Sequence, residues 1–295
     1  MTGQSAAASV EAQAASAETA LAEDFAAIQP AGFLLVLSPD WIVTRASENV
    51  HKFLGESHVT IVDQPLSKFV KAQALHDLRN LFSRLSSSGG SFCAYRVRLT
   101  EDQRWFDLVF QASHGRVLLE GVDTAAQGLG EAIGSVGGLV AAMPERGSSL
   151  LESGARRMRA LTGFDRAVVT VGGRQAHSSR GKFVLDELPE RRCLRSRVIA
   201  DVQSDPVPVY PRKARHRSVE QAVLAAASPD ERALLRSHGI AATMSIPIQR
   251  GTETIGWFHC DNRTPRPCDL ETHAAAGLFA QMFAMRLEIE QLTRA

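Results

Sequence analysis

The sequence predicts an α+β protein built from two mixed domains and closed by a long C-terminal helix. Its 295 residues correspond to about two domains of roughly 150 residues each. Short apolar runs bounded by turn residues alternate with segments of helical spacing, which is typical of mixed folds. Near the C-terminus, apolar residues recur in alternating steps of four and three, the pattern of a helix that packs along a seam.

The first domain, expected at 23–125, begins with the apolar run Phe33 to Leu37 and the turn Ser38-Pro-Asp40. Residues 41–44 continue as the hairpin partner of that run. Helical spacing then predicts helices and, after them, three antiparallel strands. The helices are expected at 49–54 and 72–85, and the strands at 92–99, 104–112 and 115–123.

Residues 126–160 are expected to be mainly helical and to connect this domain to the second one, at 161–280. Strands of the second domain are predicted at 167–171, 242–247 and 254–260. Ser228 has the spacing of a helix N-cap, with Glu231 three residues further on. The helix that it starts is expected to end at Gly239.

The final helix is expected to start near Asp269, and residues 281–295 extend it beyond the core of the second domain. Its seam of heptad-spaced apolar residues comprises Leu278, Met282, Met285, Ile289 and Leu292. Because an unpartnered seam would be exposed to water, we expect the helix to pair with a second copy in a homodimer. Packing of the seam on the chain's own sheet is the alternative.

Charge and composition exclude several classes of protein. A net charge of +1 gives no overall field that favours nucleic acid or an anionic membrane as partner. No apolar stretch has the length of a transmembrane helix, and no secretory signal peptide is expected. Residues 1–22, rich in Ala, Ser and Gln, are expected to form a mobile arm. The four scattered cysteines favour a reduced, cytoplasmic setting.

Five strings in the second half of the chain occur together and in order. They are Arg197-Val-Ile-Ala-Asp201, Asp205-Pro-Val-Pro-Val-Tyr-Pro211, Ala227-Ser-Pro-Asp-Glu231, His238-Gly-Ile-Ala-Ala-Thr-Met-Ser245 and Cys260-Asp-Asn-Arg-Thr-Pro-Arg266. Together they resemble the chromophore-binding GAF domain of bacteriophytochromes. Ile28-Gln-Pro-Ala-Gly32, with Ser47 and Asn49, resembles the start of the PAS domain of that family. The resemblance implies a PAS domain followed by a GAF domain, and a light or signal sensor.

In this family the two domains are joined by a figure-of-eight knot, in which the segment ahead of the PAS domain threads a lasso of the GAF domain. The resemblance places the start of the lasso near Asp205, where several prolines fix φ and stiffen the chain. It therefore implies that residues about 20–30 pass beneath residues about 205–227. Such a crossing is very rare among proteins in general.

The resemblance also implies that the usual covalent attachment of a bilin is missing. Bacteriophytochromes attach biliverdin through a cysteine ahead of the PAS domain, but the first cysteine here is Cys93, well inside that domain. Plant and cyanobacterial relatives use a GAF cysteine, and Asp230 stands at its position. We therefore expect no covalently bound cofactor.

Several noncovalent contacts of the family are replaced as well. Glu231 stands at one pocket histidine, and Asp261 and Asn262 stand at the two histidines of a Cys-His-His string. An ionised carboxylate only accepts hydrogen bonds, and it would repel the propionates of a bilin. Ala225 replaces one propionate-binding arginine, whereas Arg197 occupies the position of the other.

The resemblance thus gives a set of ligand-pocket candidates, to which two strand hydroxyls belong. The set is Arg197, Glu231, Thr243, Ser245, Asp261 and Asn262. For Arg197, a surface arginine on a strand edge is the competing interpretation. Noncovalent biliverdin, anchored by Arg197, stays open as an alternative to a different ligand.

Other chemistry finds less support. His259, Cys260, Cys268 and His273 match no common zinc spacing, and neighbours on a strand point to opposite faces, so no metal site is expected. Cys193 lies among arginines, but an ordinary exposed thiol is favoured over a redox sensor. The basic segment 212–217 lies where aromatic residues are scarce, so a solvated loop is favoured over a nucleic-acid site. No catalytic signature is present, and an enzyme is not expected.

The sequence therefore predicts a cytoplasmic, phytochrome-like PAS–GAF sensory module with a degenerate chromophore pocket. It would bind a small ligand or an unidentified signalling partner protein and pass the change through its C-terminal helix. Two alternatives remain open. One is a ligand-free dimerisation scaffold, and the other is a photoreceptor that binds biliverdin noncovalently.

Overall fold

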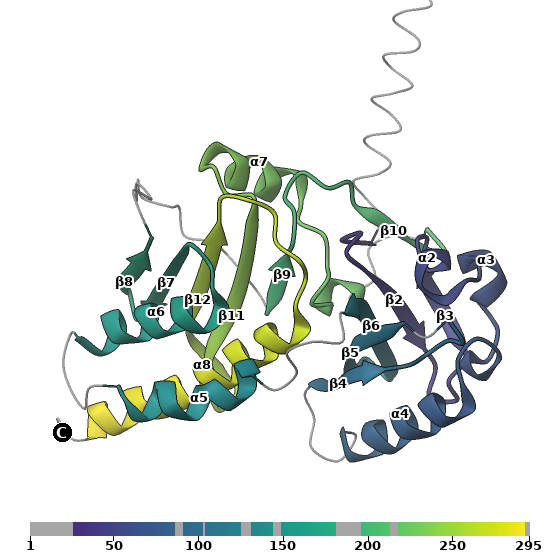
Figure 1. The fold of residues 1–295 in the computed structure, drawn as a ribbon, viewed down its shortest axis with the longest axis horizontal. Helices are drawn as coiled ribbons and strands as arrows, with labels where there is room; N and C mark the ends of the chain where they lie inside the picture. The colour runs from purple at the N-terminus through teal and green to yellow at the C-terminus, as the bar shows by residue number, and fades with distance from the viewer. Residues whose placement is uncertain are drawn as a thin grey trace, which may run out of the picture.

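The computed structural model of this protein contains two antiparallel sheets, each with helices packed on one face (Figure 1). The expected arm at 1–22 and Cys193 lie outside the described residues. Those that the structure describes are 26–85, 91–102, 104–124, 131–143, 149–180, 196–212 and 218–292.

The N-terminal sheet contains seven strands among the described residues, in the order β1-β10-β3-β2-β6-β5-β4. The strands are β1 (Ala27–Ile28), β10 (Val207–Tyr210), β3 (Val43–Ser47), β2 (Gly32–Leu37), β6 (Arg116–Thr124), β5 (Trp105–Ser113) and β4 (Ser91–Val97). The helices that accompany them are α2 (His51–Leu54), α3 (His58–Ile61), the 3₁₀ turn η1 (Leu66–Lys68) and α4 (Ala72–Leu85). The strands predicted in this half and the helix at 72–85 are confirmed. β10 was missed, because it comes from the second half of the chain.

β2 explains how this sheet joins two cores. Its six residues are all buried, as the unbroken apolar run predicts for a strand covered on both faces. Phe33, Leu35 and Leu37 pack with α4 and the other small helices in the core of the N-terminal domain. Leu34 and Val36 point the other way, into a core that continues into the C-terminal domain. The two domains are therefore joined by shared apolar packing.

The C-terminal sheet has the order β8-β7-β12-β11-β9 within the described residues. The strands are β8 (Arg174–Ser179), β7 (Arg166–Val171), β12 (Glu253–Asn262), β11 (Ala242–Arg250) and β9 (Arg197–Ile199). The helices are α5 (Glu131–Ala141), α6 (Ser149–Thr162), η2 (Val219–Gln221), α7 (Pro229–Ser237) and α8 (Leu270–Leu292). Helices α5, α6 and α8 lie together along one face of the sheet, whereas α7 lies at its end (Figure 1).

The start of α7 follows from its sequence. Ser228 has extended backbone angles, and its hydroxyl accepts a hydrogen bond from the backbone N–H of Glu231 at 3.2 Å, which confirms the predicted N-cap. Pro229 occupies the first turn, where its missing N–H costs nothing. Gly239, with φ of +65°, follows the helix and permits the left-handed backbone that ends it.

The C-terminal helix α8 has apolar residues on two sides. Phe279 and Phe283 are fully buried against Phe258 of β12 and hold the helix on the sheet. Leu278, Met285 and Ile289 are exposed instead, at 40%, 62% and 54% of their surface. Met282 is half-buried against the core, and the side chain of Leu292 lies outside the described part. Most of the predicted seam therefore faces away from the chain's own sheet.

Residues 26–29 run between two limbs of the lasso, defined here as residues 205–227. On one side, β1 pairs with β10, with Ala27 opposite Pro208 and Ile28 opposite Val207. On the other side, the N–H of Gln29 donates to the Leu224 carbonyl at 2.8 Å, and the N–H of Ala226 donates to the Ala27 carbonyl at 3.0 Å. Backbone hydrogen bonds on both sides are what the predicted figure-of-eight crossing requires.

The side chain of Gln29 fixes this crossing to the C-terminal sheet. Its amide nitrogen donates to the Val198 carbonyl at 2.8 Å, and its carbonyl oxygen accepts from the Ala200 N–H at 2.9 Å. The side chain is buried, so both bonds lie away from water. One amide therefore satisfies two backbone groups of the strand β9 region.

We expect Gln29→Ala to lower the free energy of unfolding by about 1–3 kcal/mol, because it leaves these buried backbone groups without partners. Urea denaturation followed by circular dichroism measures the change. Gln73→Ala is the matched control, because Gln73 is an exposed residue of α4 bonded to Asp77, and it should leave the midpoint unchanged. Equal midpoints for Gln29→Ala and the parent protein would contradict this account of the crossing.

Candidate functional site

The face of the C-terminal sheet opposite α6 and α8 carries most of the predicted pocket residues. The register places Arg197 of β9 opposite Ser245 of β11, and Ser245 opposite His259 of β12. In the neighbouring row, Thr243 lies opposite Asp261. Residues directly opposite one another share a face of the sheet. Together they form one polar surface, made of Arg197, Thr243, Ser245, His259 and Asp261.

Asp261 is the best-satisfied member of this surface. Its Oδ2 accepts from Nε and Nη2 of Arg166 at 3.1 and 2.6 Å, and its Oδ1 accepts from the Thr243 hydroxyl at 2.7 Å. The side chains of Arg166 and Asp261 are 2% and 0% exposed. A buried carboxylate needs such partners, because an isolated buried charge is strongly disfavoured. Arg166, which was not among the predicted pocket residues, thus neutralises Asp261.

Ser245 and His259 form the next row of the surface. The serine hydroxyl and Nδ1 of His259 are hydrogen-bonded at 3.0 Å, and both residues are buried. The indole of Trp257 stacks near the His259 ring, with 6.1 Å between the ring centroids. An imidazole therefore remains on this face, two residues before the position where the resemblance places one.

Arg197 and Glu231 form an ion pair that joins β9 to the first turn of α7. Their side chains are 16% and 26% exposed, so the pair is only partly shielded from water. β9 is an edge strand of the sheet, as the competing interpretation of Arg197 expected. The guanidinium is nevertheless bound to Glu231. Glu231 and Arg197, both predicted pocket residues, are thus paired with each other.

Asn262 does not belong to this surface. Its Oδ1 accepts from the Asp165 N–H at 3.2 Å, and its amide nitrogen donates to the carbonyl and hydroxyl oxygens of Thr264 at 2.9 Å each. The side chain therefore holds two loops at the end of β12. Strand alternation explains the difference, because consecutive residues point to opposite faces.

His259, a member of the surface, and Arg166, which pairs with Asp261, are not among the residues predicted from the sequence. His259 was reachable from the sequence, since strand alternation puts it on the face of Asp261. No local signal identifies Arg166 as the partner of Asp261, because that pairing comes from the register of β7 on β12. Asp261 lies opposite Arg166 across those two strands.

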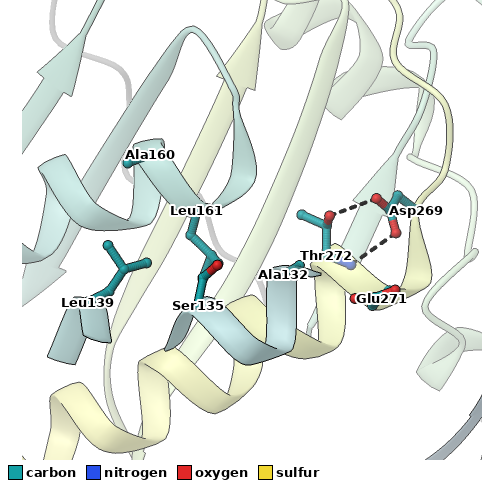
Figure 2. A pocket seen from close by; sticks show the side chains of 8 residues that line it. All are labelled: Ala132, Ser135, Leu139, Ala160, Leu161, Asp269, Glu271 and Thr272. Carbon is teal, nitrogen blue, oxygen red and sulfur yellow. Dashed lines mark hydrogen bonds between the residues drawn. The ribbon is translucent and has the colours of Figure 1, made fainter. Parts of the chain in front are cut away.

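A separate hollow of about 410 Å³ lies on the other side of the sheet, between α5, α6 and the start of α8 (Figure 2). Its walls include Leu139, Leu161 and Thr272. Asp269 at its rim caps α8 by accepting from the N–H and hydroxyl of Thr272 at 3.0 and 2.7 Å. None of the six predicted pocket residues lines this hollow, so it is distinct from the polar surface.

The residues considered for metal chemistry are placed apart. Cys260 is fully buried in the core, on the face opposite His259, as strand alternation predicts. His273 of α8 is hydrogen-bonded through Nε2 to the Ser196 hydroxyl at 2.7 Å. Within the described ranges, His, Cys, Asp and Glu side chains do not gather in groups of three that could hold a metal ion. None of the described helices combines the length and apolar character that a membrane crossing requires.

Comparison with known proteins identifies both halves. A model of the PAS fold matches residues 24–120, and a GAF domain model matches residues 147–290. Cyanobacterial phytochrome B of a Nostoc species is 23% identical over 297 residues, which cover 90% of this chain and 39% of that protein. A bacteriophytochrome of Pseudomonas aeruginosa is 25% identical over 293 residues, 89% of this chain and 39% of the relative. The chain is a phytochrome-like PAS–GAF sensory module.

Solved structures show the same fold for the module. The chromophore-binding domain of a Stigmatella aurantiaca bacteriophytochrome superposes with a TM-score of 0.74 at 24% identity, covering 90% of this chain and 97% of that one. The corresponding domain of a bacteriophytochrome from R. palustris gives a TM-score of 0.71 at 21% identity, covering 92% and 97%. The predicted family resemblance and α+β fold class are confirmed. The module spans 39% of the length of the two curated relatives.

We expect Asp261→Asn to destabilise the module by about 3–5 kcal/mol, because it leaves the buried Arg166 guanidinium without a counter-charge. Chemical denaturation monitored by tryptophan fluorescence measures this loss. Glu253→Gln is the control, because it breaks an ion pair with Arg250 in which both side chains are largely exposed. If Asp261→Asn unfolds at the same denaturant concentration as the control, the pair does not stabilise the sheet.

Proposed function

We propose that this module is the input part of a phytochrome-like receptor that has lost covalent bilin attachment. It responds instead to a noncovalently bound small ligand or to a docked partner protein. The observation that carries the proposal is the ion pair of Arg197 with Glu231, which occupies the anchor that a bilin carboxylate would need. The PAS and GAF folds themselves belong to sensory rather than catalytic modules.

The described thiols support the loss of covalent attachment. Cys93 is half-buried on β4, and burial raises the pKa of its thiol above the usual range. Burial also raises the pKa of Cys268 to about 12, and Cys260 is fully buried in the core. Because the thiolate is the nucleophile of cysteine, these thiols are unsuited to bond formation near neutral pH. Asp230, at the position of the GAF cysteine, has no thiol.

The polar surface sets the chemistry of any ligand. Thr243, Ser245, His259 and Asp261 are already hydrogen-bonded within the protein. A ligand with negative charge must displace Glu231 from Arg197 before it gains an ionic contact. The surface therefore suits two kinds of ligand. One is a neutral, hydrogen-bonding ligand that leaves the ion pair in place. The other is noncovalent biliverdin, which must displace Glu231.

We expect the module, co-expressed with a haem oxygenase, to show no bilin absorbance that survives denaturation. We also expect Glu231→Gln to tighten noncovalent biliverdin binding by roughly tenfold, because it frees Arg197 for a propionate. Absorbance titration measures the binding. Arg250→Gln, which removes a distant exposed cation, is the control. A denaturation-resistant adduct would overturn the loss of attachment, and unchanged affinity in Glu231→Gln would overturn the role of the ion pair.

The output of the proposed receptor runs through α8, which pairs with a second copy of the chain. The support is the exposed apolar row of Leu278, Met285 and Ile289, with Met282 half-buried beside it. The row keeps heptad steps on the side of α8 that faces away from its own sheet, which suits a helix of a partner. A ligand-free dimerisation scaffold would use the same row, and a specific ligand that raises the melting temperature counts against that alternative.

We expect the parent module to be a dimer and the variant Met285→Glu/Ile289→Glu to be a monomer, because two carboxylates would have to be buried in the interface. Sedimentation velocity measures the mass. Val59→Glu is the control, because Val59 is 60% exposed on α3, away from α8. A monomeric parent protein, or a double variant that stays dimeric, would contradict this interface.

A further inference from the structure

The hollow between α5, α6 and α8 has no part in the proposed function. Its volume of about 410 Å³ lies within the range of small-molecule sites in proteins, about 300–1,000 Å³. It lies on the helical side of the C-terminal sheet, whereas Arg197 and the polar surface lie on the other side. A molecule bound in it would contact three helices at once.

One end of the hollow is apolar. Ala132 and Leu139 of α5 and Leu161 of α6 are half-buried, and all three pack against the core. Ala160 of α6 continues this wall toward the surface. Figure 2 shows Leu139 at one end of the hollow and Asp269 at the other. Hydrocarbon placed against this wall would leave water, which is favourable.

The other end of the hollow is acidic. Asp269 directly precedes α8 and Glu271 lies in its first turn, with Thr272 next to them and Ser135 of α5 across the hollow (Figure 2). Glu271 is only 8% exposed, whereas Asp269 lies at the rim. A helix N-terminus carries about half a positive charge, which does not cancel two carboxylates. This end therefore stays negative.

Neighbouring groups do not reverse this sign. Burial raises the pKa of Asp107 on β5, and the charge of Asp269 adds to the rise, so a further acid lies close by. Arg266 is the nearby cation, and its guanidinium donates to the Gly163 carbonyl at 2.8 Å and lies 4.7 Å from the centre of the Phe164 ring. That cation is therefore engaged at the C-terminal end of α6.

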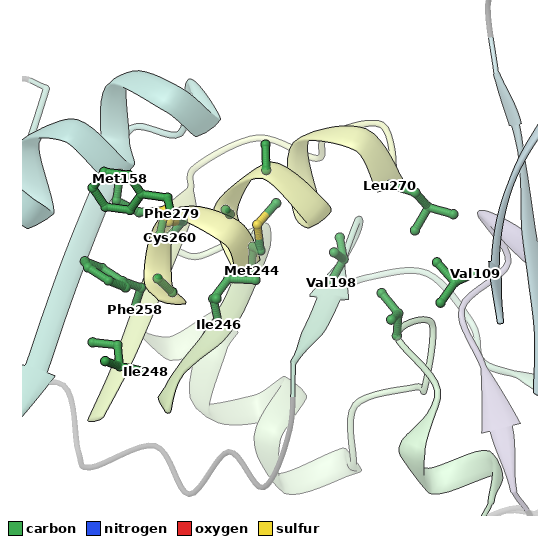
Figure 3. Packing of buried hydrophobic residues seen from close by; sticks show 14 of the residues in the cluster. Val109, Met158, Val198, Met244, Ile246, Ile248, Phe258, Cys260, Leu270 and Phe279 are labelled. Atoms are coloured by element: carbon green, nitrogen blue, oxygen red, sulfur yellow. The ribbon is translucent and has the colours of Figure 1, made fainter. Parts of the chain in front are cut away.

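A smaller cavity of about 20 Å³ adjoins the hollow. The two share Asp269 and Thr272 in their walls. The smaller cavity also reaches Val198 of β9 and Met244 of β11, and Figure 3 shows both side chains in the core that α8 covers. The hollow is thus separated by one narrow cavity from the strand that carries Arg197.

We infer that this hollow is a binding site for a small organic cation with an apolar body, such as a primary alkylammonium ion. The ammonium group lies at the end formed by Asp269 and Glu271, and the hydrocarbon lies against Leu139 and Leu161. Two carboxylates repel an anion of the same shape, and a neutral molecule gains the apolar contact alone. The inference goes beyond the proposed function, since it concerns a second site on the other side of the sheet.

A matched set of ligands tests the preference for positive charge. Hexylammonium, hexanoate and hexan-1-ol share a chain length, and at neutral pH they are positive, negative and neutral. Methyl groups labelled with ¹³C in Ala132, Leu139, Ala160 and Leu161 report binding by NMR. We expect hexylammonium to shift these signals to saturation, hexan-1-ol to bind roughly tenfold more weakly, and hexanoate more weakly still. Equal dissociation constants for the three ligands, or shifts that avoid these four residues, would overturn the inference.

Chain length tests the apolar wall. From butylammonium to heptylammonium, each added methylene is expected to lower the dissociation constant by about threefold, because each one removes further hydrocarbon from water. The same NMR titration measures this series. A dissociation constant that is independent of chain length means that the wall is not used, and the inference is then wrong.

Two variants locate the site on the chain. Asp269→Asn keeps an N-cap of equal quality and removes one charge, so it should bind hexylammonium about threefold more weakly and hexan-1-ol as before. Ala160→Trp, at an exposed position of α6, fills the hollow with an indole and should abolish binding of both. Glu253→Gln, which removes an exposed acid paired with Arg250, is the control and should bind as the parent protein does.

Unchanged hexylammonium binding in either Asp269→Asn or Ala160→Trp contradicts the assignment of the site. Equal losses in Asp269→Asn and Glu253→Gln contradict it as well, because the effect would then follow net charge alone. None of these measurements involves biliverdin or Arg197, so their failure is distinguishable from failure of the proposed function.

Discussion

The structure depends on the placement of four residues, 26–29, between the limbs of the lasso. Their backbone groups bond to β10 on one side and to residues 224–226 on the other, and Gln29 adds two bonds to the β9 region. The two bonds of the Gln29 side chain are buried, so losing either one leaves a polar group without water or partner. The crossing therefore fixes β10 in the N-terminal sheet and fixes β9, with Arg197, in the C-terminal one.

The polar surface of the C-terminal sheet shows how charged side chains are kept inside the domain by pairing. Asp261 is neutralised by Arg166, and Arg197 by Glu231. The first pair is fully buried and serves the sheet, because breaking it leaves a charge with no solvent. The second pair is partly exposed and joins two elements, so it can be exchanged for a ligand contact at lower cost. The surface thus divides into a fixed part and an exchangeable part.

Local patterns in the sequence predicted what depends on local physics. The apolar run of β2, the helical spacing of α4 and the N-cap Ser228 each reflect neighbours a few residues apart. What the sequence could not give depends on register between distant strands. The partner of Asp261 lies 95 residues earlier, at Arg166, and β10 pairs with β3, whose Ser47 lies opposite Val209. The family resemblance supplied the crossing, which no periodicity indicates.

Helix α8 is the element through which these features meet. Its first residue, Leu270, packs at the junction near Val109, and its middle is held on the C-terminal sheet by Phe279 and Phe283. Its outer row points away from both domains. A stiff helix clamped in the middle passes a change at one end to the other, because packed interfaces switch between discrete arrangements rather than deform smoothly. A change at Arg197 on β9 would therefore reach α8 through β11, which packs against both elements.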